Sequence, residues 1–166
     1  MASYKIEYAA SSAVTITLGS LAQSSTLLAG RESDAIDNTS NKYLDYLLAG
    51  KIRTGGTATA STRIQICVVA LMEDSTWPDV FDGTDSTETI TNVNMKNCIC
   101  RIAADITIAA TTATDYPFGP CSVAALFGGV MPKKFVVFVT HNTGGNLDST
   151  NGNHTIYITP VYATIA

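Results

Sequence analysis

Charge is scarce in this chain, and its last fifth is almost without it. Charged side chains make up 14% of the 166 residues, against about 25% in an average soluble domain. Residues 135–166 contain no Lys or Arg, and Asp148 is their only acidic residue. The formal net charge is −4, and the ten basic residues are scattered along the chain. Because non-specific binding to nucleic acid needs clustered Lys and Arg, we expect no nucleic-acid partner.

Long apolar runs and a hydrophobic leader are also missing. No apolar run approaches the roughly 18 residues that a membrane-spanning helix needs. Residues 1–5, with the sequence MASYK, do not begin the hydrophobic core of a signal peptide. We therefore expect synthesis in the cytoplasm and no membrane partner.

Cysteine is present, but without the spacing of a metal site. Zinc sites use cysteines separated by about two to four residues, whereas one residue separates Cys98 from Cys100, and Cys67 and Cys121 are distant. Cytosolic synthesis disfavours disulfides. Because Cys otherwise behaves as a small hydrophobe, we expect four buried free thiols.

Catalytic motifs are missing as well. The chain contains neither a G-x-S-x-G nucleophile elbow nor a G-x-x-x-x-G-K-[ST] phosphate loop. Its two histidines, His141 and His154, flank a polar loop whose ends a hairpin could bring together, and we expect hydrogen-bonding roles for them rather than metal or acid–base chemistry. We expect a protein that is not an enzyme and has no cofactor and no small-molecule substrate.

A loop over residues 73–88 is acidic and also carries aromatic residues. Asp79, Asp82 and Asp85 are candidate calcium ligands, because calcium prefers hard oxygen atoms, although their spacing does not match an EF-hand. The alternative, which we favour, is a turn-rich loop in which Asp side chains bond their own backbone. Trp77, Pro78 and Phe81 either form a lid on the core or anchor a partner, since aromatic residues are enriched at interface hot spots.

Apolar patterning predicts seven or eight strands and one helix. The strongest strand signals are residues 63–72, 135–140 and 154–165, and in the last Pro160 indicates an edge or a bulge. Residues 43–53 fit a helix or a strand, and we favour the strand. Residues 122–127 are a further expected strand, and residues 116–120 an expected turn. Two tyrosines of the last strand, Tyr157 and Tyr162, are candidate interface residues.

The expected helix covers about residues 94–106. Six apolar residues recur there at helical spacing: Met95, Cys98, Ile99, Ile102, Ala103 and Ile106. Asn92 or Asn94 can cap its start, and Lys96 falls on the opposite, polar face. A parallel βαβ fold would need a helix after each strand. The pattern instead predicts a mainly β chain, an antiparallel β-sandwich or jelly roll in a single domain.

Several segments resemble small proteins that are encoded beside the capsid genes of tailed bacteriophages. They are YLDYLLAGKIRTG followed by RIQI, then WPDVFDGTDS, then YPFGP, LFGGVMPKKFVVFVTH and residues 154–166. The resemblance spans about residues 36–166 and implies a jelly-roll-like β-sandwich there. Residues 1–35 resemble the family least and are either an N-terminal arm or the first strands.

The resemblance also implies a function. It indicates a capsid decoration, or cement, protein on the virion surface, whose partners are the major capsid protein and copies of itself in a dimer or trimer. No catalytic residues are implied. The alternatives are a tail or head-fibre component, meaning a tube or completion protein or a glycan- or receptor-binding jelly roll. An enzyme using the acidic loop or the two histidines is the weakest alternative.

Overall fold

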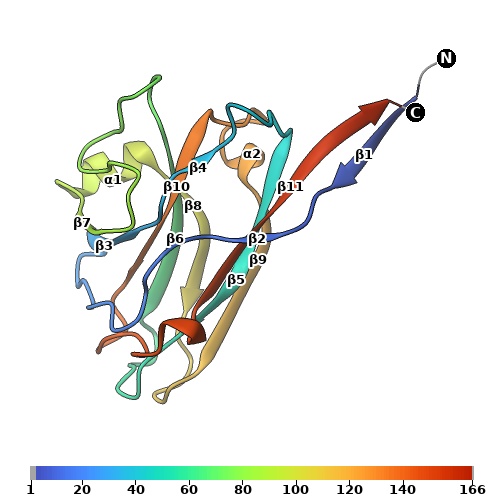
Figure 1. Ribbon diagram of the computed structural model, residues 1–166. Helices are drawn as coiled ribbons and strands as arrows, with labels where there is room; N and C mark the ends of the chain where they lie inside the picture. The colour runs from blue at the N-terminus through green and yellow to red at the C-terminus, as the bar shows by residue number, and fades with distance from the viewer. Residues whose placement is uncertain (1–2, 166) are drawn as a thin grey trace.

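A computed structural model describes residues 3–165 of the chain. Within these residues the chain forms eleven strands, two short α-helices and one 3-10 helix. The strands build two antiparallel sheets that pack face to face, as Figure 1 shows. The expected antiparallel β-sandwich is therefore confirmed.

The first sheet contains five of the described strands. Four follow the order β1 (Tyr4–Tyr8), β11 (Thr155–Ile165), β5 (Asp45–Arg53) and β9 (Asp115–Ser122). The fifth, β2 (Ser12–Ala13), pairs with the earlier part of β11, at Tyr157 and Ile158, on the same side as β1. The outer strand is irregular between β1 and β2, since the register of β1 with β11 and that of β2 with β11 differ by one residue. Pro160 itself lies in β11, which pairs with a strand on each side in regular register, so the expectation that it marks an edge strand or a bulge is wrong.

The second sheet contains six of the described strands. Five follow the order β7 (Thr87–Thr89), β3 (Ala29–Glu32), β10 (Lys134–His141), β6 (Arg63–Ala70) and β8 (Cys100–Thr107). The sixth, β4 (Ile36–Asp37), also pairs with β10. The helices are α1 (Val93–Ile99), α2 (Val123–Leu126) and the 3-10 helix η1 (Asn151–Asn153).

The strand order is that of a jelly roll. With β1 and β2 taken together and the short β4 and β7 set aside, eight principal strands remain. One sheet then contains the first, eighth, third and sixth strands in that order, and the other contains the second, seventh, fourth and fifth. Each sheet thus alternates strands from the two ends of the chain, as in a double Greek key. Residues 1–35 supply strands to both sheets.

Strand β10, which carries no charged residue after Lys134, is buried on both of its faces. Phe135, Val137 and Val139 point into the core between the two sheets. Val136 and Phe138 point the other way, into a second apolar cluster outside this sheet. All five side chains are fully buried. Burial on both faces explains why this segment is continuously apolar rather than alternating.

The expected helix over residues 94–106 is only half present. Helix α1 ends at Ile99, and β8 begins at Cys100 and pairs with β6. The apolar residues Ile102, Ala104 and Ile106 also alternate with period two, so pairing with a buried strand overrides the helical pattern. The Asn92 cap is confirmed, because its side chain accepts a hydrogen bond from Met95 N at 2.9 Å.

Lys96 was expected on the polar face of this helix, but it is buried. Its Nζ donates to Leu27 O at 2.7 Å and to Gln65 Oε1 at 2.6 Å. Lys96 therefore lies on the side of the helix that faces the second apolar cluster and the sheet. The solvated side of the helix consists instead of Val93, Asn94, Asn97 and Cys98.

Other expectations met mixed outcomes. Residues 43–53 form strand β5 from Asp45 onward, as favoured. The expected turn at residues 116–120 lies inside β9, and the expected strand at 122–127 is mostly helix α2, capped by the Ser122 hydroxyl. The expectation of four buried thiols is met at two of them. Cys67 and Cys100 are buried, whereas Cys121 is half-buried and Cys98 is exposed.

None of the helices in residues 3–165 has both the length and the apolar character needed to cross a membrane.

Candidate functional site

The acidic loop folds as a lid over the outer face of the second sheet. Phe81 is 4% exposed, and its ring meets Phe138 edge-on with the ring centroids 5.4 Å apart. Gly83 has a positive φ of 82°, and an added Cβ there would lie 2.9 Å from the Trp77 ring, so the Asp82–Gly83 turn is packed under the indole. The loop is therefore held by its own aromatic residues.

The five candidate interface residues differ in what they leave accessible. Pro78 and Phe81 are buried within their own chain, and Trp77 is half-buried against the second apolar cluster. Tyr157 is 45% exposed on the first sheet. Tyr162 is half-buried, and its hydroxyl donates to Glu7 Oε2 at 3.2 Å. Trp77, Tyr157 and Tyr162 therefore retain surface that a partner can contact.

The candidate calcium ligands Asp79, Asp82 and Asp85 have separate hydrogen-bond partners. Asp79 accepts from Thr91 N at 2.9 Å, and Asp82 accepts from Thr84 N at 2.8 Å. Asp85 binds Arg31 and Thr17. Among residues 3–165 no three His, Cys, Asp or Glu side chains lie together as a metal site requires. Only Asp82 makes the local backbone bond of the turn-forming alternative, whereas Asp79 and Asp85 bond to more distant segments.

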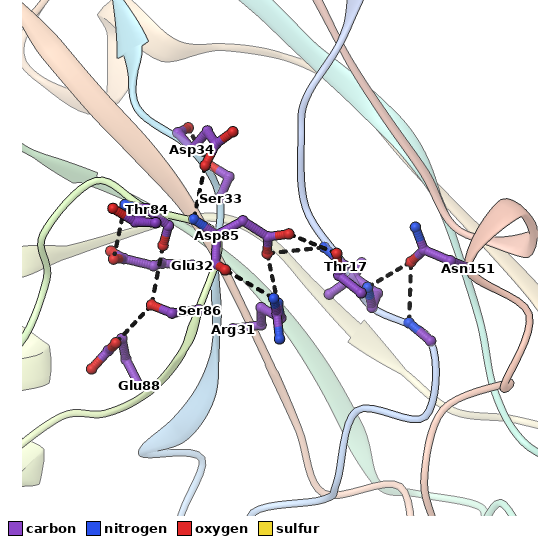
Figure 2. Close-up of polar contacts among 12 residues, drawn as sticks. Thr17, Arg31, Glu32, Ser33, Asp34, Thr84, Asp85, Ser86, Glu88 and Asn151 are labelled. Atoms are coloured by element: carbon purple, nitrogen blue, oxygen red, sulfur yellow. Dashed lines mark hydrogen bonds and ion pairs between the residues drawn. The ribbon is translucent and has the colours of Figure 1, made fainter.

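Asp85 lies at the centre of the polar network in Figure 2. Its Oδ1 accepts from Arg31 Nε at 2.6 Å, and its carboxylate also accepts from Thr17 N at 3.0 Å and Thr17 Oγ1 at 2.6 Å. Its backbone N–H donates to Asp34 Oδ1 at 2.8 Å. Burial opposes ionisation of Asp85, but the bonds from Arg31 and Thr17 outweigh it and lower the pKa of the carboxyl. The network ties the acidic loop to β3 and to the segment after β2.

Glu32 is the most unusual residue of this network. Its side chain is fully buried on β3, and Oε1 accepts from Asp82 N at 3.1 Å and Thr84 N at 3.4 Å. No described group bonds to its Oε2. Burial, with the nearby Asp82 carboxyl, raises the pKa of Glu32 to about 7. The pKa of the Asp82 carboxyl is shifted the other way, below its ordinary value, by the neighbouring Glu32 carboxyl and by the bond from Thr84 N. The sequence carries no signal for this pair, because its members come from distant segments.

A pocket of about 440 Å³ lies beside the network, between residues 19–23 and strands β3 and β7. Its charged lining residues already have partners within the chain. Arg31 is paired with Asp85, and Glu88 accepts from Ser86 Oγ at 2.8 Å. The lining therefore offers a polar, hydroxyl-rich surface, with no acid–base pair facing one another across it.

The two histidines bond to backbone groups, which agrees with the expected hydrogen-bonding role. His141 Nε2 donates to Leu21 O at 3.0 Å, since a carbonyl can only accept, and Nδ1 lies 3.0 Å from Thr143 Oγ1. His154 Nδ1 accepts from Arg53 N at 3.3 Å, and Nε2 donates to Asp148 O at 3.0 Å. Burial lowers the pKa of His141 to about 4, although its bond to Leu21 O opposes this shift. Both rings hold loops in place.

The most exposed apolar surface lies on a projecting ribbon made of β1 and the end of β11. Strand β5 pairs with β11 as far as Val161, whereas β1 pairs with it as far as Ile165. The last residues of β11 and their partners in β1 therefore extend beyond the sandwich, as Figure 1 shows. The outward exposure is large at Tyr4 (78%), Tyr8 (64%) and Ile165 (70%). The sequence allowed an N-terminal arm but did not indicate that β11 extends with it.

Replacing Asp85 tests the role of the polar network. We expect Asp85→Ala to lower the free energy of unfolding by about 2 kcal/mol, because it leaves a largely buried Arg31 without its partner and breaks two bonds to Thr17. The matched control is Asp115→Ala, which removes a more exposed carboxylate that also binds two cations, Lys51 and Arg53. That variant should lose clearly less stability than Asp85→Ala in urea unfolding, because exposed ion pairs contribute little. Equal losses would show that Asp85 has no special role.

Comparisons with protein-family models, curated protein sequences and solved structures found no match to this chain. The fold and the site define a jelly-roll β-sandwich with a bonded acidic lid and an exposed apolar ribbon. No relative adds a function to that description.

Proposed function

We propose that this protein is a structural virion component, a decoration or cement protein that binds the outer face of a phage head and stabilises contacts between major capsid subunits. The observation that carries the proposal is the projecting ribbon, whose apolar side chains are exposed. Clustered apolar surface of this kind on a small protein marks an interaction site. A partner that covers this surface removes its apolar side chains from water, and the hydrophobic effect makes that binding favourable.

The rest of the chain supports a role in assembly. The side chains with the richest chemistry, among them His141, His154 and Asp85, are occupied in bonds that hold loops together. The outer surface contains many Ser and Thr residues and few charges. Such a surface can pack beside other subunits without strong repulsion between like charges.

Modest contacts are sufficient for such a role. A shell presents many equivalent sites, and linked copies bind with an avidity that exceeds the affinity of each contact. An exposed strand edge can also be extended by a strand from a neighbour. Both effects need an accessible surface on each copy, and the ribbon provides exposed apolar side chains and an exposed strand edge.

The test is binding of the purified full chain to expanded capsids that lack it, followed by sedimentation of the particles. We expect wild-type protein to sediment with the capsids and Ile165→Ser to bind about tenfold more weakly, because a buried Ile side chain contributes about 1.5–3 kcal/mol. The matched control is Val130→Ser, which removes an apolar side chain of nearly equal exposure, 71% against 70%, outside the ribbon. Failure of the wild-type protein to bind any capsid form would overturn the proposal.

One observation favours the second candidate, a glycan-binding tail or head-fibre component. The pocket beside β3 and β7, at about 440 Å³, has a volume that suits a small ligand and a polar lining. Trp77, the candidate interface residue whose ring could stack on a sugar, does not line this pocket. Binding of the chain to an immobilised glycan panel, weakened by Arg31→Ala, would favour this candidate over capsid decoration.

A further inference from the structure

We infer that β1 is a dimerisation edge, at which two copies of the chain pair through antiparallel β1 strands with Ile6 opposite Ile6 of the second copy. This deepens the homo-oligomeric part of the proposed function. Self-association is measured without capsids, so the two proposals can fail separately.

The backbone of β1 is open along one side. The strand pairs with β11, and no described residue pairs with its other edge. Ala9, which follows β1 in the same register, donates its N–H toward β11, to Pro160 O at 2.9 Å. Because hydrogen-bonding direction alternates along an antiparallel strand, Tyr4, Ile6 and Tyr8 direct their N–H and C=O groups outward. Such an edge is a template for another strand.

The side chains of β1 are complementary to themselves in one register. With Ile6 opposite Ile6, each Lys5 lies opposite Glu7 of the second copy, and each Tyr4 lies opposite Tyr8. Lys5 Nζ already lies 3.2 Å from Glu7 Oε1 within one copy, so the four charges of a dimer would alternate in sign. Opposite charges and aromatic pairs directly across from one another stabilise a sheet.

Neighbouring registers are disfavoured. A shift of two residues in one direction places Lys5 opposite Lys5, and a shift in the other direction places Glu7 opposite Glu7. A shift of one residue sets outward-facing backbone groups against inward-facing ones. The register centred on Ile6 is therefore the one that satisfies both the backbone and the charges.

Pairing also explains how the ribbon could be stable. A two-stranded ribbon alone is at best marginally stable in water, whereas two ribbons joined at β1 form a four-stranded sheet. Residues directly opposite in an antiparallel pair point to the same face. The exposed apolar faces of both copies, each with Tyr4, Ile6, Tyr8 and Ile165, therefore combine into one larger surface.

The experiment is analytical ultracentrifugation of the full chain over a wide range of concentration. We expect a species of twice the 17.5 kDa chain mass. Lys5→Glu should raise the dissociation constant of the dimer at least about tenfold, because two attractive pairs become repulsive. The double variant Lys5→Glu/Glu7→Lys should restore it, because the charges are exchanged but still opposite. Lys133→Glu, which removes an exposed ion pair with Asp74, is the control and should leave the dimer unchanged.

Ile6→Pro provides an independent test of the backbone pairing. The Ile6 N–H points outward, so proline there removes a bond between copies without removing one between β1 and β11. Circular dichroism should show an intact fold, and ultracentrifugation should show a monomer. A wild-type monomer at every concentration, a trimer, a dimer that survives both Lys5→Glu and Ile6→Pro, or a double variant that does not recover would each overturn the inference.

Discussion

Glu32→Gln is expected to stabilise the protein by about 3 kcal/mol at about pH 8 and to have little effect at about pH 4. In the folded protein, burial and the Asp82 carboxyl raise the pKa of Glu32 from 4.5 to about 7. The folded state therefore binds a proton that the unfolded chain releases above pH 4.5, and stability falls as the pH rises through that interval up to about 7. Glutamine stays neutral at every pH, and its side-chain oxygen can still accept from Asp82 N, so the variant avoids this loss.

Urea unfolding of wild type and variant across this pH range measures the effect. The difference in the free energy of unfolding should grow with pH and level off above about pH 7. Glu88→Gln serves as the control, because Glu88 is a half-buried carboxyl of the same loop that bonds to Ser86. It should change stability by less than about 0.5 kcal/mol. A Glu32→Gln effect that is the same at every pH would contradict a buried proton at Glu32.

His141→Gln is expected to have the opposite dependence on pH. Burial lowers the pKa of His141 from 6.5 to about 4, so below pH 6.5 the unfolded chain takes up a proton that the folded state does not. Wild-type stability should therefore lose about 3 kcal/mol from this residue as the pH falls from about 7 to about 4. Glutamine does not titrate. The variant should be less stable than wild type by about 1 kcal/mol at about pH 7, through the lost bond to Thr143, and more stable at about pH 4.

The measurement is again urea unfolding at a series of pH values. His154→Gln is the matched control, because His154 also bonds to the backbone at both ring nitrogens in the same part of the fold. That variant should be destabilised, because it loses the bonds from Arg53 N and to Asp148 O, and it measures the cost of removing a bonded imidazole ring. A constant difference between wild type and His141→Gln would show that His141 takes up its proton equally in both states.

The two residues have a joint consequence for the wild-type protein. Glu32 makes the folded state less stable as the pH rises between about 4.5 and about 7, and His141 makes it more stable between about 4 and about 6.5. Where the intervals overlap, the two slopes have similar size and opposite sign. Each single variant therefore reveals a slope that the wild-type protein largely conceals.

Local pattern predicted strands well where burial is unambiguous. The apolar runs of β10 and β6 both became strands, as expected, and residues 43–53, which fitted either a helix or a strand, form β5 as favoured. The pattern failed at residues 100–107, where helical and strand spacings coincide and the pairing of β8 with β6 decided the outcome. It also failed at Tyr116–Pro120, whose prolines and glycine indicate a turn although the segment lies in the edge strand β9, where proline is tolerated.

The candidate site was less accessible to sequence reasoning. The acidic loop and its aromatic residues were recognised, but not the partners that its carboxylates find. Asp85 bonds to Thr17 and Arg31, which lie 68 and 54 residues away in the sequence. Glu32 stands alone as an acidic residue in β3 and becomes unusual only when the loop covers it.

The sequence by itself determined the β-sandwich, because alternating and doubly buried apolar segments can satisfy their backbone and their side chains together only in packed sheets. The near absence of charge in the last fifth of the chain likewise indicated buried strands there, and β10 and much of β11 are buried. Only the tertiary structure decided that Glu32 is buried beside Asp82, that the acidic residues bond separately and that β1 and β11 extend as a ribbon. These features depend on contacts between residues far apart in the chain, and local spacing carries no information about which distant segments meet.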